Sequence, residues 1–145
     1  MKNKTAAIIL ALILAAGVAF LYHMGCGISL FAKVKTGEGS STHSEADILE
    51  AISIVRKEFR NLSGCFMTEI RYSEEKTQQE LAEKREYGFS SLPGDFDDVI
   101  VLESTFTTSK HFSSITFNGV TQRNYNWIIT HTEADGWQFC TAGYA

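Results

Sequence analysis

The feature that most constrains this chain is an apolar run from Ala6 to Tyr22, which follows two lysines, Lys2 and Lys4. A signal peptide has an apolar region of roughly 7 to 15 residues, whereas a membrane-spanning helix needs about 20. The run lies between these two lengths, and every charged or patterned segment follows it. The sequence therefore divides into a membrane-directed leader, residues 1–32, and a downstream globular part.

Two outcomes for the leader follow from its length. It is an uncleaved single-pass anchor if Ile28, Leu30 and Phe31 extend the uncharged stretch to a full span, and this is the outcome that we predict. Cleavage after the small residues Gly17-Val18-Ala19 would instead release a secreted chain that begins at Phe20. In both cases the downstream part is extracytoplasmic.

Lipid attachment at Cys26 is a third outcome, because Met24-Gly25-Cys26 resembles the end of a bacterial lipobox. His23 stands where that motif has leucine, so we do not predict lipidation. The basic residues on the two sides of the apolar run are nearly balanced and do not decide its orientation. The short N-terminal tail and the signal-like layout place the downstream part outside the cytoplasm.

The length and charge of the chain limit the classes of protein to which it can belong. A chain of 145 residues leaves room for one domain of about 100 residues after the leader and a linker. There are 17 acidic against 13 basic residues, and the basic residues are scattered among the acids. Because phosphate binding needs clustered Lys and Arg, we predict no nucleic-acid partner.

A segment rich in Gly, Ser and Thr predicts a flexible linker over residues 33–43, ahead of a folded domain at 44–145. Ser44 followed by Asp47 is typical of a capping box at the start of a helix. From Glu45 to Arg60, apolar residues recur at three- and four-residue spacing and predict a helix with one buried stripe. The stripe consists of Ile48, Leu49, Ile52, Val55 and Phe59.

Three segments follow the predicted helix. Cys65 to Tyr72 alternates in polarity and predicts a strand. Its predicted faces are Phe66, Thr68, Ile70 and Tyr72 on one side, with Cys65, Met67, Glu69 and Arg71 on the other. Glu74 to Glu86 has a helix-favouring but polar composition and predicts a short exposed helix. Tyr87 to Phe96 contains glycines and the single proline, and predicts a surface loop.

The C-terminal third of the chain is rich in β-branched and aromatic residues. Val99 to Thr108, Gln122 to Thr132 and Trp137 to Ala142 predict three further strands, with Asp135-Gly136 as a hairpin turn. Residues 109–121 predict either an additional strand or a long hairpin loop. The sequence therefore predicts an α+β domain in which a helix packs on a curved antiparallel sheet of about four to five strands.

Several residues occur in an order that is known from one group of domains. They are Gly64-Cys65, Ile70, Tyr72, Asp98, Ile100, Val101, Leu102, Ser104, Asn126-Trp127, Ile129, Gly136-Trp137 and Gly143-Tyr144. Over about Glu45 to Tyr144 the chain resembles small, uncharacterised extracytoplasmic domains of Gram-positive bacteria, which are similar to the NTF2-like (cystatin-like) α+β superfamily. The resemblance implies a cone-shaped fold, with no activity and no catalytic residues attached to it. The longer loop Gly88–Phe96 departs from the pattern at the rim of the cone.

The concave side of such a sheet is where a ligand would sit. A carboxylate or imidazole that is buried there can act as a general base, and the candidates are Glu69, Glu103 and His131, with Arg71 and Tyr72 as polar neighbours. Alternate strand positions that face water explain the same residues without any chemistry. We therefore predict no catalytic residue and keep these three as weak candidates.

Metal and sulfur chemistry also have weak candidates. Asp95, Asp97 and Asp98 offer oxygen ligands but lack the register and closing glutamate of an EF-hand loop, so we predict a solvated loop. Cys65 and Cys140 would be free to form a disulfide in an oxidising exterior, or to stay as two buried thiols. Because the chain has no CxxC motif and no Cys/His cluster, we predict no zinc and no cofactor.

These features together predict a membrane-anchored extracytoplasmic binding or interaction module that is not an enzyme. Its partners would be the membrane, through the N-terminal helix, and an unknown protein, peptide or small ligand. One alternative is a small hydrolase or isomerase that uses a carboxylate or histidine in the cone pocket. A second alternative is a structural subunit that forms a homodimer through an apolar sheet face.

Overall fold

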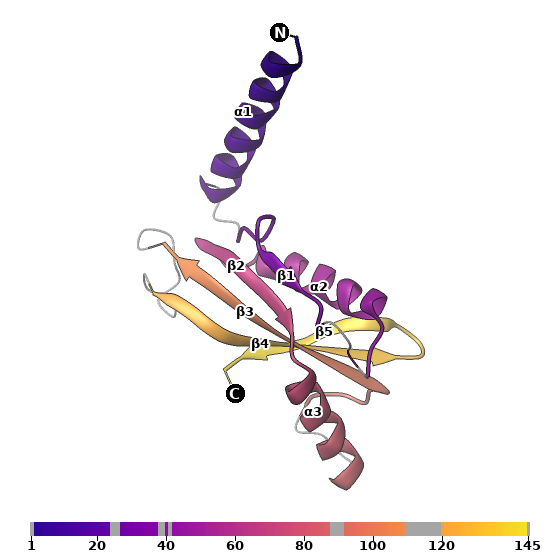
Figure 1. The fold of residues 1–145 in the computed structure, drawn as a ribbon. Coiled ribbons are helices and arrows are strands. Elements are labelled where there is room, and N and C mark those ends of the chain that lie inside the picture. The colour runs from indigo at the N-terminus through magenta and orange to yellow at the C-terminus, as the bar shows by residue number, and fades with distance from the viewer. Residues whose placement is uncertain are drawn as a thin grey trace.

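The computed structural model describes residues 2–23, 27–37, 40, 42–87, 92–109 and 120–144. Within these ranges the chain is an α+β protein with three helices and one five-stranded mixed sheet (Figure 1). The elements in chain order are α1 (Lys2–His23), β1 (Lys33–Lys35), α2 (Glu45–Phe59), β2 (Cys65–Tyr72), α3 (Glu74–Tyr87), β3 (Asp98–Thr108), β4 (Thr121–Thr132) and β5 (Gly136–Gly143). The predicted α+β class is thus confirmed.

Some predictions fall on residues outside these ranges. Cys26, the candidate for lipidation, is one of them. Residues 88–91, which belong to the predicted loop, and residues 110–119, where we left a strand or a hairpin loop open, also lie outside the described part of the chain.

α1 extends away from the sheet as a separate rod (Figure 1). Its segment Lys4–Leu21 is 18 residues long, none of it is buried in the domain, and it is apolar enough to cross a membrane. A signal peptide has the same character near an N-terminus. The apolar side chains lie on all sides of α1, as is typical of a helix that is surrounded by lipid.

The five strands are ordered β1-β2-β3-β4-β5, so each strand pairs with its neighbours in sequence. β2 to β5 form antiparallel pairs, whereas β1 is parallel to β2 with Val34 opposite Ile70. β1 lies in the segment that we predicted to be linker. A three-residue strand is too short to show alternation, which is why its sequence did not reveal it.

The segment before β1 is also part of the domain. Ile28 is 3% exposed, its amide donates to Cys65 O at 2.9 Å, and its carbonyl accepts from the Met67 amide at 2.8 Å. Ile28 therefore belongs to the domain. Contrary to our expectation, it does not lengthen the membrane helix. The Gly27 amide donates to Arg60 O at 3.0 Å, and a side chain at Gly27 would collide with the Phe59 carbonyl.

α2 packs on one face of the sheet and encloses the main core. Ser44 caps the helix by accepting from the Asp47 amide, as predicted. Four members of the predicted stripe, Ile48, Ile52, Val55 and Phe59, are buried, but Leu49 is 47% exposed. The strands contribute Met67, Ile70, Ile100, Leu102, Phe106, Trp127 and Ile129 to this core.

The faces of β2 differ from the predicted alternation. A β-bulge interrupts the register between Met67 and Glu69. Because a bulge inserts one extra residue, Cys65 and Met67 lie on the same buried face as Ile70 and Tyr72. Simple alternation had separated these two pairs.

α3 lies on the opposite face of the sheet and covers only part of it. A small apolar cluster of Leu81, Phe96 and Val99 joins α3 to this face. The buried Thr77 hydroxyl accepts a hydrogen bond from the Val101 amide at 3.0 Å. Beside this cluster the face combines polar and apolar residues, and the candidate site lies there.

Candidate functional site

A pocket of about 350 Å³ opens between α3 and the sheet face that α2 leaves free. It is lined by Lys76, Gln79 and Glu80 from α3, by Val101 from β3, by Asn126 and Ile128 from β4, and by Leu92 and 141–144 at its edge. We call it the α3 pocket. Strand alternation explains its mixed character, because every second residue of β3 and β4 faces α3.

An ion-pair network centred on the buried Glu103 carboxylate adjoins the α3 pocket. Glu103 and Asn126 are directly paired across β3 and β4. Lys76 Nζ lies 2.9 Å from Glu103 Oε1 and donates to Asn126 Oδ1 at 2.8 Å. Arg71 approaches the other oxygen of Glu103, with Nη2 at 2.7 Å and Nε at 2.9 Å. The carboxylate is therefore satisfied on both sides, from α3 and from β2.

This network decides the ionisation of Glu103. Burial opposes the charged form, but the Lys76 and Arg71 cations outweigh burial and hold the pKa of the Glu103 carboxyl below its usual value. Glu103 is therefore an ionised structural anion at neutral pH. A carboxylate of this kind is a poor general base, because protonation would break two ion pairs.

Glu80 is in the opposite situation. Its Oε2 atom is buried and has no hydrogen-bond partner among the described residues. Burial, with a smaller effect from the nearby Glu83 carboxylate, raises the pKa of Glu80. An unsatisfied buried oxygen is costly, and here it lines a pocket. No sequence signal indicates this role, because Glu80 lies in a polar helix that we expected to be exposed.

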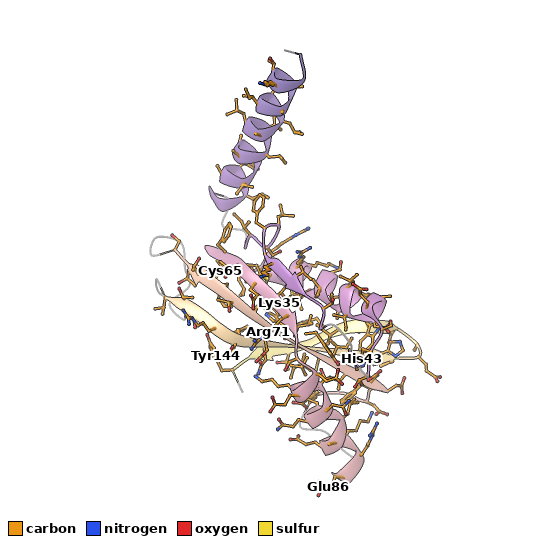
Figure 2. The ribbon with its side chains drawn as sticks, viewed as in Figure 1. Lys35, His43, Cys65, Arg71, Glu86 and Tyr144 are labelled. Carbon is orange, nitrogen blue, oxygen red and sulfur yellow. The ribbon has the colours of Figure 1, made fainter. Side chains whose placement is uncertain are left out.

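The three weak catalytic candidates do not form one site. Glu103 belongs to the network beside the α3 pocket, and Glu69 pairs with Lys35 at 2.7 Å near the edge of the sheet. His131 lies on the α2 side, where its ring packs against Trp137 with centroids 5.0 Å apart. Figure 2 shows Lys35 and Arg71 close together, Lys35 on the edge strand β1 and Arg71 on β2.

The three candidate metal ligands also diverge. Asp95 is fully exposed and lies 3.6 Å from Lys84 Nζ. Asp97 accepts from the Glu133 amide at 2.8 Å, and Asp98 is turned toward His43. Within the described residues no group of three His, Cys, Asp or Glu side chains is arranged to hold a metal ion.

The two cysteines of the domain are free thiols. Cys65 lies on β2 and Cys140 on β5, with β3 and β4 between them. Three strand spacings of about 4.8 Å exceed the Cα separation of about 7 Å that a disulfide tolerates. The pairing that we left open is therefore not formed, and burial raises the pKa of the Cys65 thiol to about 11.

His43 is a buried residue whose role we did not predict. Its side chain is 2% exposed, with Nε2 3.1 Å from Asp98 Oδ1 and Nδ1 3.1 Å from the Tyr72 hydroxyl. The Trp137 ring packs edge-on against it at 5.8 Å. Both ring nitrogens are occupied, so His43 fixes the chain before α2 to the sheet and is closed to a substrate. Figure 2 shows it at the end of the sheet away from α1.

A second contact fixes the same segment of chain. The Ser40 hydroxyl donates to Glu74 Oε2 at 2.8 Å, and the Thr42 hydroxyl donates to Glu74 Oε1. These bonds, that of Thr42 first, lower the pKa of Glu74 to about 2. The residues before α2 are therefore held at the start of α3, although their composition predicted a flexible linker.

Comparison with known protein families, with curated proteins and with solved structures finds no match to this chain. The resemblance to NTF2-like domains therefore stays a prediction, and the function has to be argued from the geometry of the α3 pocket and from α1.

Proposed function

We propose that this protein is a membrane-anchored binding module. Its domain lies on the outer side of the cell membrane and binds a ligand in the α3 pocket without catalysing a reaction. The length and apolar character of Lys4–Leu21 support the anchor. The short basic N-terminus supports the outward orientation. A helix packed on a twisted, mostly antiparallel sheet is compatible with an NTF2-like cone, which we retain as part of the proposal.

The observation that carries the proposal is the unpartnered Glu80 oxygen in the wall of the α3 pocket. Native proteins rarely leave a buried polar atom unsatisfied, and a ligand that donates a hydrogen bond would satisfy it. A matching N–H or O–H group is therefore the first requirement for the ligand.

Lys76 supplies the second requirement. It lies one helical turn before Glu80 on α3, so the two side chains emerge from neighbouring positions. Its ammonium has more N–H donors than its bonds to Glu103 and Asn126 use. A cation and a carboxylate side by side suit a zwitterion, so the proposed ligand is an amino acid or the end of a short peptide.

An alternative function is supported by the same glutamate. A carboxyl group with a raised pKa in a pocket is a candidate general acid, and a peptide held there would be a candidate substrate for hydrolysis. We favour binding, because Glu103 is held in two ion pairs and, among the described residues, Glu80 is the one carboxyl group that lines the pocket.

Thermal-shift and calorimetric titrations of the purified full-length protein in detergent test the proposal. The probes are amino acids and dipeptides, each compared with its amine and its carboxylic acid analogue. We expect at least one zwitterion to raise the Tm and to bind at least ten-fold more tightly than both analogues. Glu80→Gln and Asn126→Ala should each weaken this binding, whereas Gln138→Ala on the exposed part of β5 should leave it unchanged.

The same titrations separate the two functions. Release of free amino acids from a dipeptide by the native protein, abolished in Glu80→Gln, would replace the binding proposal with the hydrolase alternative. Equal binding by the native protein and both pocket variants would show that the α3 pocket is not the site.

The orientation needs its own experiment. Ala134 lies in the exposed turn between β4 and β5, so Ala134→Cys in a Cys140→Ser background offers one accessible thiol in the domain. A membrane-impermeant maleimide should label it on intact cells to the same extent as on permeabilised cells. Labelling only after permeabilisation would place the domain in the cytoplasm and overturn the proposal.

A further inference from the structure

The segment between α1 and β1 contains a tight turn with an unusual composition. The Ala32 amide donates to Ser29 O at 3.2 Å, which closes a β-turn with Leu30 and Phe31 at its corners. Both corner side chains are 63% exposed. Turn corners that face water favour Gly, Asn, Asp, Ser and Pro. Two large apolar side chains at this place therefore indicate that the turn faces an apolar environment.

The turn is held rigidly on both sides. Ile28 before it is bonded to β2 through its amide and its carbonyl, and Ala32 after it is buried in the main core. Both flanks of the turn are therefore fixed, and Leu30 and Phe31 are presented at its exposed tip. A rigid turn loses little conformational entropy when its tip enters another phase.

The turn also lies close to the end of the apolar helix. Leu30 lies seven positions after His23 in the sequence, and seven residue steps span at most about 25 Å. Leu21 of α1 and Leu30 line the same cavity of about 460 Å³. If α1 spans the membrane, the turn lies at the membrane surface.

Basic side chains border the same cavity. Arg56 in the last turns of α2 and Arg60 at its C-cap line it together with Leu21 and Leu30. The Arg56 Nε atom is buried and has no hydrogen-bond partner among the described residues. The chain as a whole has a net charge of −4, so this cationic corner is a local exception. A phosphate oxygen is the acceptor that guanidinium groups bind best.

We propose that the Leu30-Phe31 turn enters the lipid interface while Arg56 and Arg60 bind the phosphates of phospholipid headgroups. This inference rests on the proposed membrane anchor. It goes beyond anchoring, because a domain that is seated at two places has a fixed orientation, whereas one on a single helix rotates freely. Since α3 projects from the side of the domain opposite to α1 (Figure 1), seating would hold the α3 pocket away from the bilayer.

Tryptophan quenching by brominated phospholipids tests the inference in the full-length protein reconstituted into nanodiscs. Phe31→Trp keeps an aromatic residue at the turn and should lose at least half of its added fluorescence to lipids that are brominated near the headgroup. Leu49→Trp is the matched control, because Leu49 is an exposed apolar residue in the first half of α2. Its fluorescence should be unchanged.

Two further sets of substitutions test separately the contact of the apolar turn with lipid and the contact of the two arginines with phosphate. In the Phe31→Trp protein, Leu30→Ser should reduce the quenching at least two-fold, and so should Arg56→Gln combined with Arg60→Gln. Both changes leave the core intact, and unchanged circular dichroism checks this. Nanodiscs of zwitterionic phosphatidylcholine should be sufficient, because they carry the phosphate. Quenching that requires anionic lipid would overturn phosphate binding in favour of a net-charge effect.

Leu14→Trp separates this inference from the proposed anchor. Leu14 lies within the apolar segment of α1, so lipids brominated deep in their acyl chains should quench it. Quenching at Leu14→Trp without quenching at Phe31→Trp would support the membrane anchor but contradict the contact between the Leu30-Phe31 turn and lipid. Absence of quenching at both positions would contradict the proposed membrane anchor as well.

Discussion

The two faces of the sheet differ in how completely they are covered. The α2 face is closed by an apolar core in which Phe59, Phe106 and Trp127 pack edge to face. Within this core, Trp127 Nε1 donates a hydrogen bond to Ser104 Oγ at 2.8 Å. The α3 face has a small apolar cluster, a buried ion-pair network and an unpartnered carboxylate oxygen beside a pocket.

This difference separates stability from recognition. Apolar burial is the main favourable term in folding, and most of it lies under α2. Buried charges contribute little net stability, but they fix geometry and select ligands. The α3 face therefore has the features expected of a site, whereas the α2 face has those expected of a scaffold. The predictions below test this division, beginning with the largest effect.

Truncation of one core residue on each face should show the division directly. Phe59→Ala under α2 should reduce the free energy of unfolding by about 3 to 5 kcal/mol, because it removes a fully buried ring. Leu81→Ala under α3 should cost about 2 kcal/mol, since its cluster is smaller. Denaturant unfolding followed by circular dichroism in detergent measures both. Equal losses would contradict the division.

Removal of the central cation of the α3 face tests the ion-pair network. Lys76→Met should reduce the free energy of unfolding by about 1 to 3 kcal/mol, because Glu103 and Asn126 each lose a partner. Since the pKa of Glu103 in the folded state lies below its ordinary value of 4.5, this loss should be present above pH 4.5 and decline as the pH falls further.

Lys35→Met provides the matched control for that change. Lys35 also pairs with a glutamate, Glu69, but this glutamate is partly exposed, whereas Glu103 is buried. A pair of this kind contributes at most about 1 kcal/mol. If the two lysine variants unfold at the same denaturant concentration, the network beside the α3 pocket is no stronger than a surface ion pair.

Glu80→Gln should make the protein more stable and less able to bind. Because burial raises the pKa of Glu80 above its ordinary value of 4.5, the native fold loses stability as the pH rises through the folded pKa. The variant should be more stable at pH 7 by up to about 1 kcal/mol, a figure reduced by the partial exposure of the group. The gain should vanish below pH 4.5.

Glu75→Gln on the exposed side of α3 is the control for this substitution. Its effect on the Tm should be close to zero at every pH, because surface substitutions of this kind change stability by about 0.5 kcal/mol or less. A Tm of Glu80→Gln that stays below that of the native protein at pH 7 would show that Glu80 is satisfied and that the α3 pocket lacks an unpaired acceptor.

Periodicity was sufficient to predict the elements whose buried and exposed faces stay the same along their whole length. The stripe on α2 and the composition of β3 and β4 each repeat a simple pattern, and α2, β2 and α3 begin where predicted. Short or irregular elements gave no such pattern. β1 has three residues, and the bulge in β2 reverses the alternation at a point where neither Thr68 nor Glu69 marks it.

The candidate site was harder to predict than the fold, because it depends on contacts between distant segments. Glu103 was recognised as a polar residue on a strand, but its partners Arg71 and Lys76 come from β2 and α3. The role of Glu80 depends on how closely α3 lies on the sheet, and that of His43 depends on Asp98, which lies 55 positions later. No local pattern contains such information.

The attachment of Ile28 to β2 determines how tension would pass from the bilayer into the domain. A pull on α1 reaches the hydrogen bond from Gly27 to Arg60 O, then the two hydrogen bonds of Ile28, and then the parallel pairing of β1. The mechanical load would fall on the interior strand β2, at the end where Cys65 and Met67 bond to Ile28.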